Sequence, residues 1–197
     1  MWRTTAGLWG PLGFAAAAVA AARRQPAYSH RANHVSGLAS LGERSASLMV
    51  PGFVTLAAAQ SVLSAPTPTL RRLARAAAAT TLLAGVVRVS DPRCPQPGFD
   101  PDATASDLGH GVASIATFVL WTTMPVVAAR DPEVPVWYRR LARVAAVSTI
   151  ATFVGAGVTT RLDSSCKGVA QRAFLASVFL FQAATGLATG AGHGSAG

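Results

Sequence analysis

An aspartate and a histidine three residues apart, Asp107 and His110, stand at the start of a long apolar segment in "SDLGHGVASIATFVLW". General acid–base chemistry needs such groups within hydrogen-bonding reach of one another and of a substrate. Asp91 lies a short way upstream and could supply the carboxylate instead. We therefore take His110, Asp107 and Asp91 as the candidate catalytic residues of an enzyme that acts on a lipid head group or another amphiphile.

The same pair also has a structural interpretation. Asp107 precedes an apolar run, where a carboxylate can accept hydrogen bonds from the free amides of a helix start and suits the helix dipole. His110 would then lie in the first turn, at the rim of the helix or pointing into a bundle. Capping is the favoured role for Asp107, whereas both interpretations of His110 stay open.

A long polar stretch, "YSHRANHVSGLASLG", contains the candidate binding residues His34 and Ser36, and Arg88 further along the chain is the third. If this stretch were helical, His30 and His34 would share a face at a spacing found in zinc sites. His110 and an aspartate could then complete the ligand set and activate a water. No HExxH motif is present. We therefore predict no metal and no other cofactor, and keep zinc as the alternative.

The elements that must position these residues are apolar helices. Of the 197 residues, 51% are hydrophobic and 13% are charged, against about 25% charged residues in an ordinary soluble domain. A helix needs about 20 mostly apolar residues to cross a bilayer. Segments near that length predict an all-α, polytopic integral membrane protein with six transmembrane helices in one bundle. The segments are residues 5–22, 47–64, 73–89, 108–129, 141–159 and 169–190.

Residues 1–190 are predicted to form a single transmembrane domain, followed by a flexible Gly/Ser-rich tail at 191–197. The first apolar segment also has features of a secretory signal, with Arg3 before it and small residues near its end. We expect it to be retained as a span, because Arg23 and Arg24 follow it directly and it is longer than a usual signal core. Cleavage would leave five helices.

Six spans place both termini on one side of the membrane. The basic clusters "LRRLAR" and "YRRLAR" beside the third and fifth segments are typical of cytoplasmic anchors. Cys94 and Cys166 fall in loops on the opposite side, where a disulfide would indicate an oxidising compartment. We therefore predict a Cys94–Cys166 disulfide, cytoplasmic termini and a multi-pass protein of the plasma membrane. Two unrelated free thiols are the alternative.

The formal net charge of +9 comes from basic residues that lie mostly near the predicted membrane boundaries. It therefore indicates membrane lipids as partners, and not nucleic acid. Within the segments, Gln60 and Gln182 are expected to hydrogen-bond between helices, and Gly155 and Gly157 to mark close helix packing. Small-residue faces also suit a homo- or hetero-oligomer. No chain of charges crosses the predicted hydrocarbon region, which argues against an ion pump.

The stretches "HVSGLASLGERSASLMVPGFV" and "DLGHGVASIATFVLW" resemble the small prokaryotic six-span membrane proteins of domain-of-unknown-function family nine-nine-eight. The matching positions are Val35, Ser36 and Gly42 before the second span, Asp91 after the third, and His110 at the start of the fourth. The resemblance covers residues 28–128, although the segment before the fourth span is longer and richer in Pro, Asp and Cys than the family pattern. It implies the fold and the membrane location, and carries over no activity.

These features predict an integral membrane protein that handles a lipid or small molecule, or is an accessory subunit of a membrane complex. One alternative is a membrane-embedded hydrolase or transferase that acts on a lipid head group at the outer leaflet. The other is a small-molecule transporter, for which Pro51 and the glycines are hints of broken helices. Whether the protein is an enzyme stays open, because the sequence contains no complete catalytic set.

Overall fold

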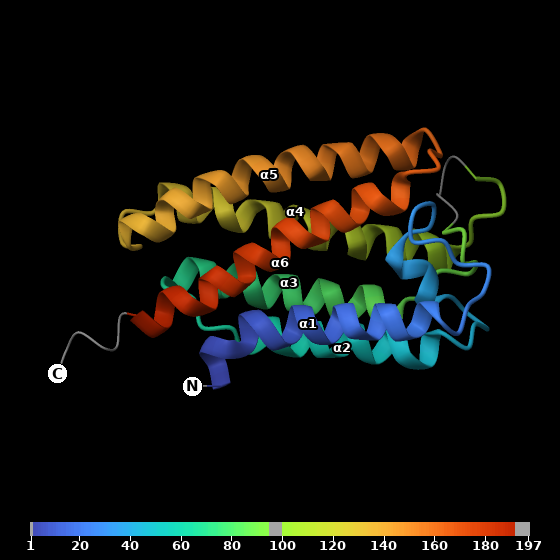
Figure 1. Ribbon diagram of the computed structural model, residues 1–197, viewed down its shortest axis with the longest axis horizontal. Coiled ribbons are helices and arrows are strands. Elements are labelled where there is room, and N and C mark those ends of the chain that lie inside the picture. The colour runs from blue at the N-terminus through green and yellow to red at the C-terminus, as the bar shows by residue number, and fades with distance from the viewer. Residues whose placement is uncertain (1, 95–99, 192–197) are drawn as a thin grey trace.

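The computed structural model describes residues 2–94 and 100–191, and this part of the chain is all-α, as predicted. Each of the six predicted apolar segments corresponds to one helix, and a short 3₁₀ helix lies in the first long connection (Figure 1). The elements are α1 (Trp2–Ala22), η1 (Val35–Ala39), α2 (Ala46–Val62), α3 (Pro68–Val86), α4 (Ala105–Arg130), α5 (Val136–Arg161) and α6 (Lys167–Ala191).

Helices α3 and α4 begin earlier than hydropathy predicts, because polar residues form their first turns. The Thr67 side chain accepts a hydrogen bond from the Leu70 N–H, and Pro68 occupies the first turn of α3, where its missing N–H costs nothing. Thr104 caps α4 in the same way. At the other end of the chain, α6 continues to Ala191, one residue into the predicted tail. The rest of that tail, residues 192–197, lies outside the described residues.

The helices form a ring in chain order, in which each helix packs against the next and α6 packs back against α1. Three connections lie together at one end of the bundle, on the right in Figure 1. They are residues 23–45, residues 87–94 with 100–104, and residues 162–166. We call this end the loop end. Helix α1 begins and α6 ends at the opposite end, which we call the terminus end (Figure 1). The start of α1 and the end of α6 therefore lie at the same end of the bundle.

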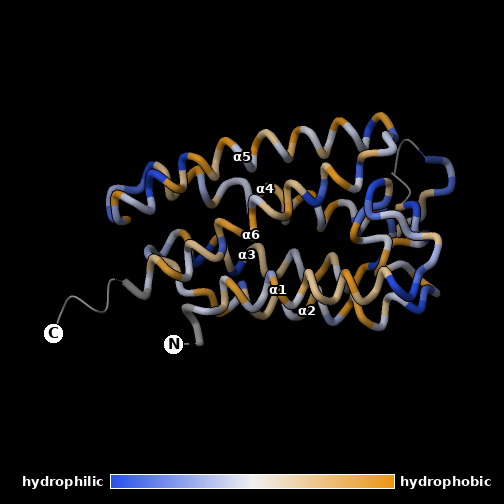
Figure 2. The backbone as a smooth tube through the Cα atoms, in the orientation of Figure 1, coloured by the Kyte–Doolittle hydropathy of each residue, from blue (hydrophilic) through white to orange (hydrophobic). Residues whose placement is uncertain are grey.

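Among the described residues, four helices are long and apolar enough to cross a membrane, namely α1 from Thr5, α4, α5, and α6 as far as Thr189. Helix α2 is apolar but has 17 residues, and the first turns of α3 carry three arginines. Figure 2 shows hydrophilic residues concentrated at the two ends of the bundle and hydrophobic residues between them. The chain thus has the helices of a membrane protein.

The outer faces of α4 and α5 are aliphatic. Val144 and Val147 on α5 are each 71% exposed. Further exposed aliphatic residues follow them along the same helix at a spacing of three to four residues. A contiguous apolar face of this kind is unfavourable in water but suits contact with lipid. The exposed aliphatic residues are Leu108, Val112, Ile115 and Val119 on α4, and Val144, Val147, Ile150, Val154 and Val158 on α5.

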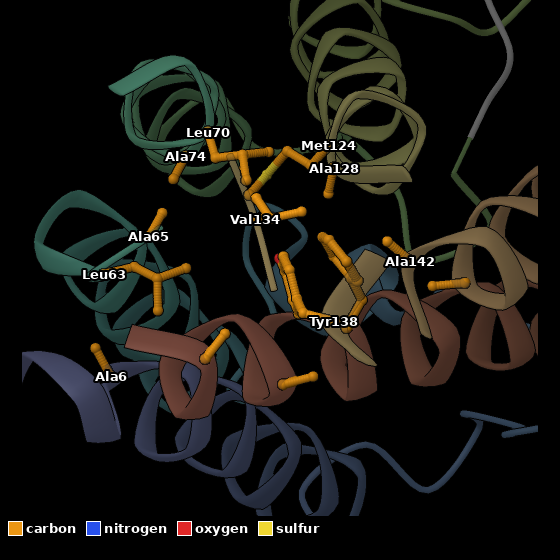
Figure 3. Close-up of a cluster of buried hydrophobic side chains, with 14 of the residues drawn as sticks. Ala6, Leu63, Ala65, Leu70, Ala74, Met124, Ala128, Val134, Tyr138 and Ala142 are labelled. Carbon is orange, nitrogen blue, oxygen red and sulfur yellow. The ribbon is translucent and has the colours of Figure 1, made fainter. Parts of the chain in front are cut away.

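The terminus end has a closely packed core of mostly small side chains, several of them alanines (Figure 3). Tyr138 of α5 is fully buried there and stacks on Phe181 of α6 with ring centroids 5.7 Å apart. Its hydroxyl makes a 2.8 Å hydrogen bond with the Thr185 hydroxyl. Because alanine lets helices approach closely, this part of the ring is filled by backbone and methyl groups around one aromatic pair.

Glycines allow the close approach of the first three helices. A β-carbon added at Gly10 of α1 would lie 2.3 Å from the Ala59 β-carbon of α2. At Gly85 of α3 it would lie 2.5 Å from the Phe53 β-carbon. Both distances are far below van der Waals contact, so these helices could not hold their spacing with any larger residue at those positions.

Candidate functional site

A cavity of about 340 Å³ lies at the loop end, between the first turns of α4 and the last turns of α5. Its wall is completed by η1, by the segment that follows α3 and by the start of α6. We call it the loop-end cavity. Its lining residues are His34, Ser36, Val89, Cys94, Asp107, His110, Gly111, Ser114, Ile115, Phe118, Phe153, Ala156, Gly157, Thr160, Arg161 and Gln171.

The lining of the loop-end cavity changes from polar to apolar with depth, and it does so on both of its main helices. The polar side chains lie near the helix ends that face the long connections, and the apolar ones lie further into the bundle. On α4 the order inward is Asp107, His110, Ser114, Ile115 and Phe118, and on α5 it is Arg161, Thr160, Ala156 and Phe153.

Aromatic rings form the deep wall of this cavity. Phe118 packs edge-on against Phe174 with ring centroids 4.8 Å apart, and against Phe153 at 6.2 Å. It also stacks on Trp121 at 5.8 Å. Aromatic pairs of this geometry are rigid and favourable, so the deep wall is a preformed surface.

The cavity opens sideways between α4 and α5. Ile115 of its lining is 59% exposed and Gly157 is also exposed. A β-carbon added at Gly111, Gly155 or Gly157 would meet no atom of the described residues within 4 Å. The prediction that Gly155 and Gly157 mark close packing is therefore wrong, because no neighbouring helix approaches either residue closely.

His110 is buried and makes hydrogen bonds through both ring nitrogens. Its Nδ1 lies 2.9 Å from the carbonyl oxygens of Ala84 and of Val87 at the end of α3. A carbonyl oxygen only accepts, so Nδ1 carries the proton and Nε2 of the neutral ring is the acceptor. The Ser114 hydroxyl, 3.1 Å from Nε2, is then the donor in that contact. His110 thus joins α3 to α4 and presents a basic nitrogen to Ser114 beside the cavity.

Asp107 has the capping role that the sequence favours, although Thr104 is the N-cap residue of α4. The Asp107 carboxylate accepts hydrogen bonds from the Thr104 N–H at 2.8 Å and hydroxyl at 2.7 Å. It also accepts bonds from the Ser90 N–H at 2.8 Å and hydroxyl at 2.6 Å. With four donors around it, the carboxylate fixes the segment after α3 to the start of α4.

Asp91 and Arg88 lie apart from this cluster. The Asp91 carboxylate accepts a 2.9 Å hydrogen bond from Arg93, which lowers the pKa of Asp91. The Arg88 side chain lines a separate shallow hollow beside Gly42 and Pro51. The structure therefore brings neither residue into the lining of the loop-end cavity, whereas it places His34, Ser36, Asp107 and His110 there.

His34 lies buried at the polar end of the cavity, just before η1, and its Nε2 makes a 2.9 Å hydrogen bond with the Thr160 hydroxyl of α5. Burial, together with the nearby charges of Lys167 and Arg172, lowers the pKa of His34 to about 4. The ring is therefore neutral at pH 7. Ser36 on η1 contacts the Cys94 thiol, with 3.6 Å between oxygen and sulfur.

The predicted disulfide is not formed, because Cys94 and Cys166 do not lie within disulfide-bonding distance and their thiols contact different partners. Cys94 is buried beneath η1, and burial raises the pKa of its thiol to about 11. Cys166 lies before α6, where its sulfur accepts a 3.6 Å hydrogen bond from Arg31, and this guanidinium lowers its pKa. The indication of an oxidising compartment that rested on this bond is withdrawn with it.

The zinc alternative needs His30 and His34 on one helical face, but residues 28–34 are not helical. His30 packs edge-on against Tyr28 and contacts Arg172, whereas His34 bonds to Thr160. Across residues 2–94 and 100–191 no three His, Cys, Asp or Glu side chains are close enough to hold one metal ion.

Two residues of α6 that the sequence did not single out fix the first connection above the cavity. Arg172 donates hydrogen bonds to the carbonyl oxygens of His30 at 2.6 Å and Asn33 at 3.1 Å, and its guanidinium lies over the Tyr28 ring. Gln171 accepts a 2.7 Å bond from the Val35 N–H. These contacts join residues more than 130 positions apart, so no local pattern could have indicated them.

Ser114 was also missed, although its signal is local, because a serine four residues after a histidine shares its helix face. Ser114, Ser36 and Gln171 line both the loop-end cavity and a second, inner cavity of about 30 Å³. Trp121 borders the inner cavity, and its buried indole N–H has no hydrogen-bond partner among the described residues. This volume is sufficient for a water molecule, which would satisfy the indole.

Comparison with known proteins gives one family. The family model described as "Protein of unknown function (DUF998)" matches residues 8–188, which is most of the chain. The chain therefore belongs to this family, and the predicted membership is confirmed through the last two helices. No curated protein and no solved structure matches the chain.

Proposed function

We propose that this member of the DUF998 family binds an amphiphilic molecule with one acyl chain in the loop-end cavity. The observation that carries the proposal is the order of polarity that α4 and α5 share, from His110 and Thr160 near the loop end to Phe118 and Phe153 deeper in the bundle. Two facing helices with the same gradient fit a molecule that has a polar group at one end and a hydrocarbon chain at the other.

Size and access support a lipid-like ligand. The volume of about 340 Å³ lies within the range of about 300 to 1,000 Å³ that is usual for small-molecule pockets. The opening at Ile115 and Gly157 lies between aliphatic helix faces. A lipid could therefore enter from the hydrocarbon of the bilayer without passing through water.

The polar end of the cavity offers both donors and acceptors to a head group. Arg161 at this polar end brings positive charge, which favours a negatively charged or acceptor-rich group. The neutral His34 ring and the Thr160 hydroxyl lie beside it. Hydrogen bonds to these groups would orient the ligand, while the aromatic wall holds its chain.

We further propose that all six helices cross the plasma membrane with both termini in the cytoplasm. Helix α2 packs between α1 and α3, and α3 packs against α4, so both lie among helices that can span. The arginines Arg71, Arg72 and Arg75 lie near the start of α3, where long basic side chains reach the interface. A reporter enzyme active only outside the cell, fused after residue 197, should stay inactive, and an active fusion would reverse the orientation.

Ligand binding is tested by closing the cavity from a residue that no neighbour crowds. In Gly157→Leu the new side chain should occupy the loop-end cavity, whereas Gly155→Leu places the same side chain two residues away on α5, outside the lining. The probe is lysophosphatidylglycerol with a 12-carbon chain, measured by native mass spectrometry of the detergent-purified protein. Wild type and Gly155→Leu should hold one probe molecule, and Gly157→Leu should bind it at least tenfold more weakly. Equal binding by all three proteins would contradict the proposal.

A further inference from the structure

The Ser114–His110 pair has the geometry of a nucleophile with its general base. The serine hydroxyl donates to His110 Nε2 at 3.1 Å, while the carbonyl oxygens of Ala84 and Val87 hold the proton on Nδ1. Activation of a serine by a histidine needs this tautomer, and the second ring nitrogen needs an acceptor that orients the ring. Here the end of α3 provides that acceptor through its backbone.

The pair lies where a bound ester would present its carbonyl group. Both residues line the loop-end cavity at the change from polar to apolar lining, since Ile115 follows Ser114 on α4. In an amphiphile such as a monoacyl lipid, the ester bond is the junction between the polar group and the chain. A ligand that follows the polarity of the cavity therefore places this bond close to Ser114.

We infer that Ser114 and His110 cleave a carboxylic ester of the amphiphile bound in the loop-end cavity, with Ser114 as nucleophile and His110 as general base. This inference rests on the proposed function, because it needs the ligand to lie in that cavity. It assigns the substrate class as monoacyl esters and the reaction as hydrolysis through an acyl-serine.

The reaction balances with water as the second substrate. Ser114 Oγ attacks the carbonyl carbon and its proton moves to His110 Nε2. The bond from the carbonyl carbon to the alcohol oxygen then breaks, and the leaving alcohol takes that proton. Water attacks the acyl-serine, gives a proton to Nε2, and releases the fatty acid as the hydroxyl of Ser114 is restored. No net proton is left on His110 after the acid has departed.

Gln171 supplies a hydrogen-bond donor for the carbonyl oxygen of the ester. Its side-chain oxygen is held by the Val35 N–H at 2.7 Å, and it lines the same two cavities as Ser114. Its amide NH₂ can therefore donate to the oxygen that becomes negatively charged in the tetrahedral intermediate. The inner cavity beside it offers a place for the water that the second step consumes.

The test separates a catalytic histidine from one that only joins helices. His110→Gln keeps an amide donor for the carbonyl oxygens of Ala84 and Val87 but has no basic nitrogen for Ser114. Ser114→Ala removes the nucleophile. Ser148→Ala is the matched control, since Ser148 is a half-buried serine of α5 whose hydroxyl donates to the Ala145 carbonyl at 3.1 Å.

Each detergent-purified protein is treated with a fluorophosphonate probe and, separately, with 12-carbon lysophosphatidylglycerol. We expect one probe adduct, located on Ser114 by peptide mass spectrometry, and release of dodecanoic acid in the wild type and in Ser148→Ala. Both signals should be lost in Ser114→Ala and fall at least 100-fold in His110→Gln, which should still bind the lipid.

The outcomes separate this inference from the proposed function. Lipid binding without an adduct and without acid release would overturn the hydrolysis and leave the proposed binding intact. Equal labelling of His110→Gln and wild type would overturn the role of His110 as base. An adduct on Ser114 in a protein that binds no lysophosphatidylglycerol would support the nucleophile and overturn the proposed ligand.

Discussion

The contacts between α1, α2 and α3 and the contact between α4 and α5 use the same residue type in opposite ways. At Gly10 and Gly85 a β-carbon would overlap the neighbouring helix, so only glycine fits there. Gly111, Gly155 and Gly157 have open space where a β-carbon would stand. In the first region glycine brings helices together, and in the second it leaves a gap. Small residues in a membrane helix therefore indicate close packing only when a partner helix approaches them.

The two ends of the bundle also differ in how closely they are packed. The core of the terminus end is alanine-rich and closed around Tyr138 and Phe181. The loop end instead keeps a cavity of about 340 Å³, with polar side chains near the connections and Phe118 deeper in the bundle. Empty volume and buried polar groups both cost stability, so their presence at one end marks the part of the fold that is suited to a ligand.

The largest effect that we expect is a dependence of stability on pH that comes from the loop end. The folded protein keeps His34 neutral down to a pKa of about 4, against 6.5 for an ordinary histidine. Between these values the unfolded chain binds more protons, so the free energy of unfolding falls as the pH falls. The loss reaches about 3 kcal/mol at pH 4.

Thermal unfolding in detergent from pH 7.5 to pH 4 checks this prediction. His34→Gln should remove that part of the pH dependence, because glutamine keeps a hydrogen-bonding group for Thr160 and does not titrate. The charged and titratable groups that face His34 remain in the variant, namely Lys167, Arg172, His110 and Asp163. Parallel curves for wild type and variant would show that burial of His34 does not govern the acid sensitivity of the loop end.

The second effect tests close packing between α1 and α2. Gly10→Ala should lower the free energy of unfolding by about 2 kcal/mol, because the new β-carbon overlaps that of Ala59. Ala59→Gly in the same chain restores the room. The double variant should therefore be more stable than the sum of the two single changes predicts, by at least 1 kcal/mol or so. Additive effects in thermal unfolding would mean that the two helices do not meet at these residues.

The sequence predicted the helices well because hydropathy is a local property. All six apolar segments are helices, and α3 and α5 each begin five residues earlier than predicted. At α3 the error arises because the first turn contains Pro68 and Arg71. Asp107 was also predictable, since a carboxylate before an apolar run commonly caps a helix. Its second partner, Ser90, lies 17 residues away and was not foreseen.

The candidate site was predicted only in part because its geometry depends on contacts across the ring. His34 and His110 both line the cavity, but the side chain that bonds to His110 is Ser114 and not Asp91 or Asp107. The prediction of a disulfide was wrong for the same reason. Two cysteines in loops at one end of the bundle need not come within the Cα separation that a disulfide bond requires. Side-chain direction decides such pairings, and sequence spacing does not fix it between distant segments.

A smaller effect should come from the closed core of the terminus end. Tyr138→Phe removes a buried hydroxyl that bonds to Thr185 at 2.8 Å. Thr185 also donates to the Phe181 carbonyl at 2.8 Å, so its own hydroxyl stays satisfied. We expect a loss of about 1 kcal/mol in the free energy of unfolding and no change in lipid binding at the loop end. Weaker lysophosphatidylglycerol binding by this variant would show that the two ends are coupled.

The smallest effect is a gain in stability at an uncrowded glycine of α5. Gly155→Ala should raise the free energy of unfolding by about 0.5 kcal/mol, because alanine lowers the backbone entropy cost of the helix and its β-carbon meets nothing within 4 Å. Gly52→Ala is the matched control in α2, where the β-carbon would lie 2.7 Å from that of Ala17. It gains the same helix propensity but overlaps a neighbour, so it should destabilise the protein. If both variants lost stability in thermal unfolding, α5 would be closely packed at Gly155, and the contrast between the two regions would not hold.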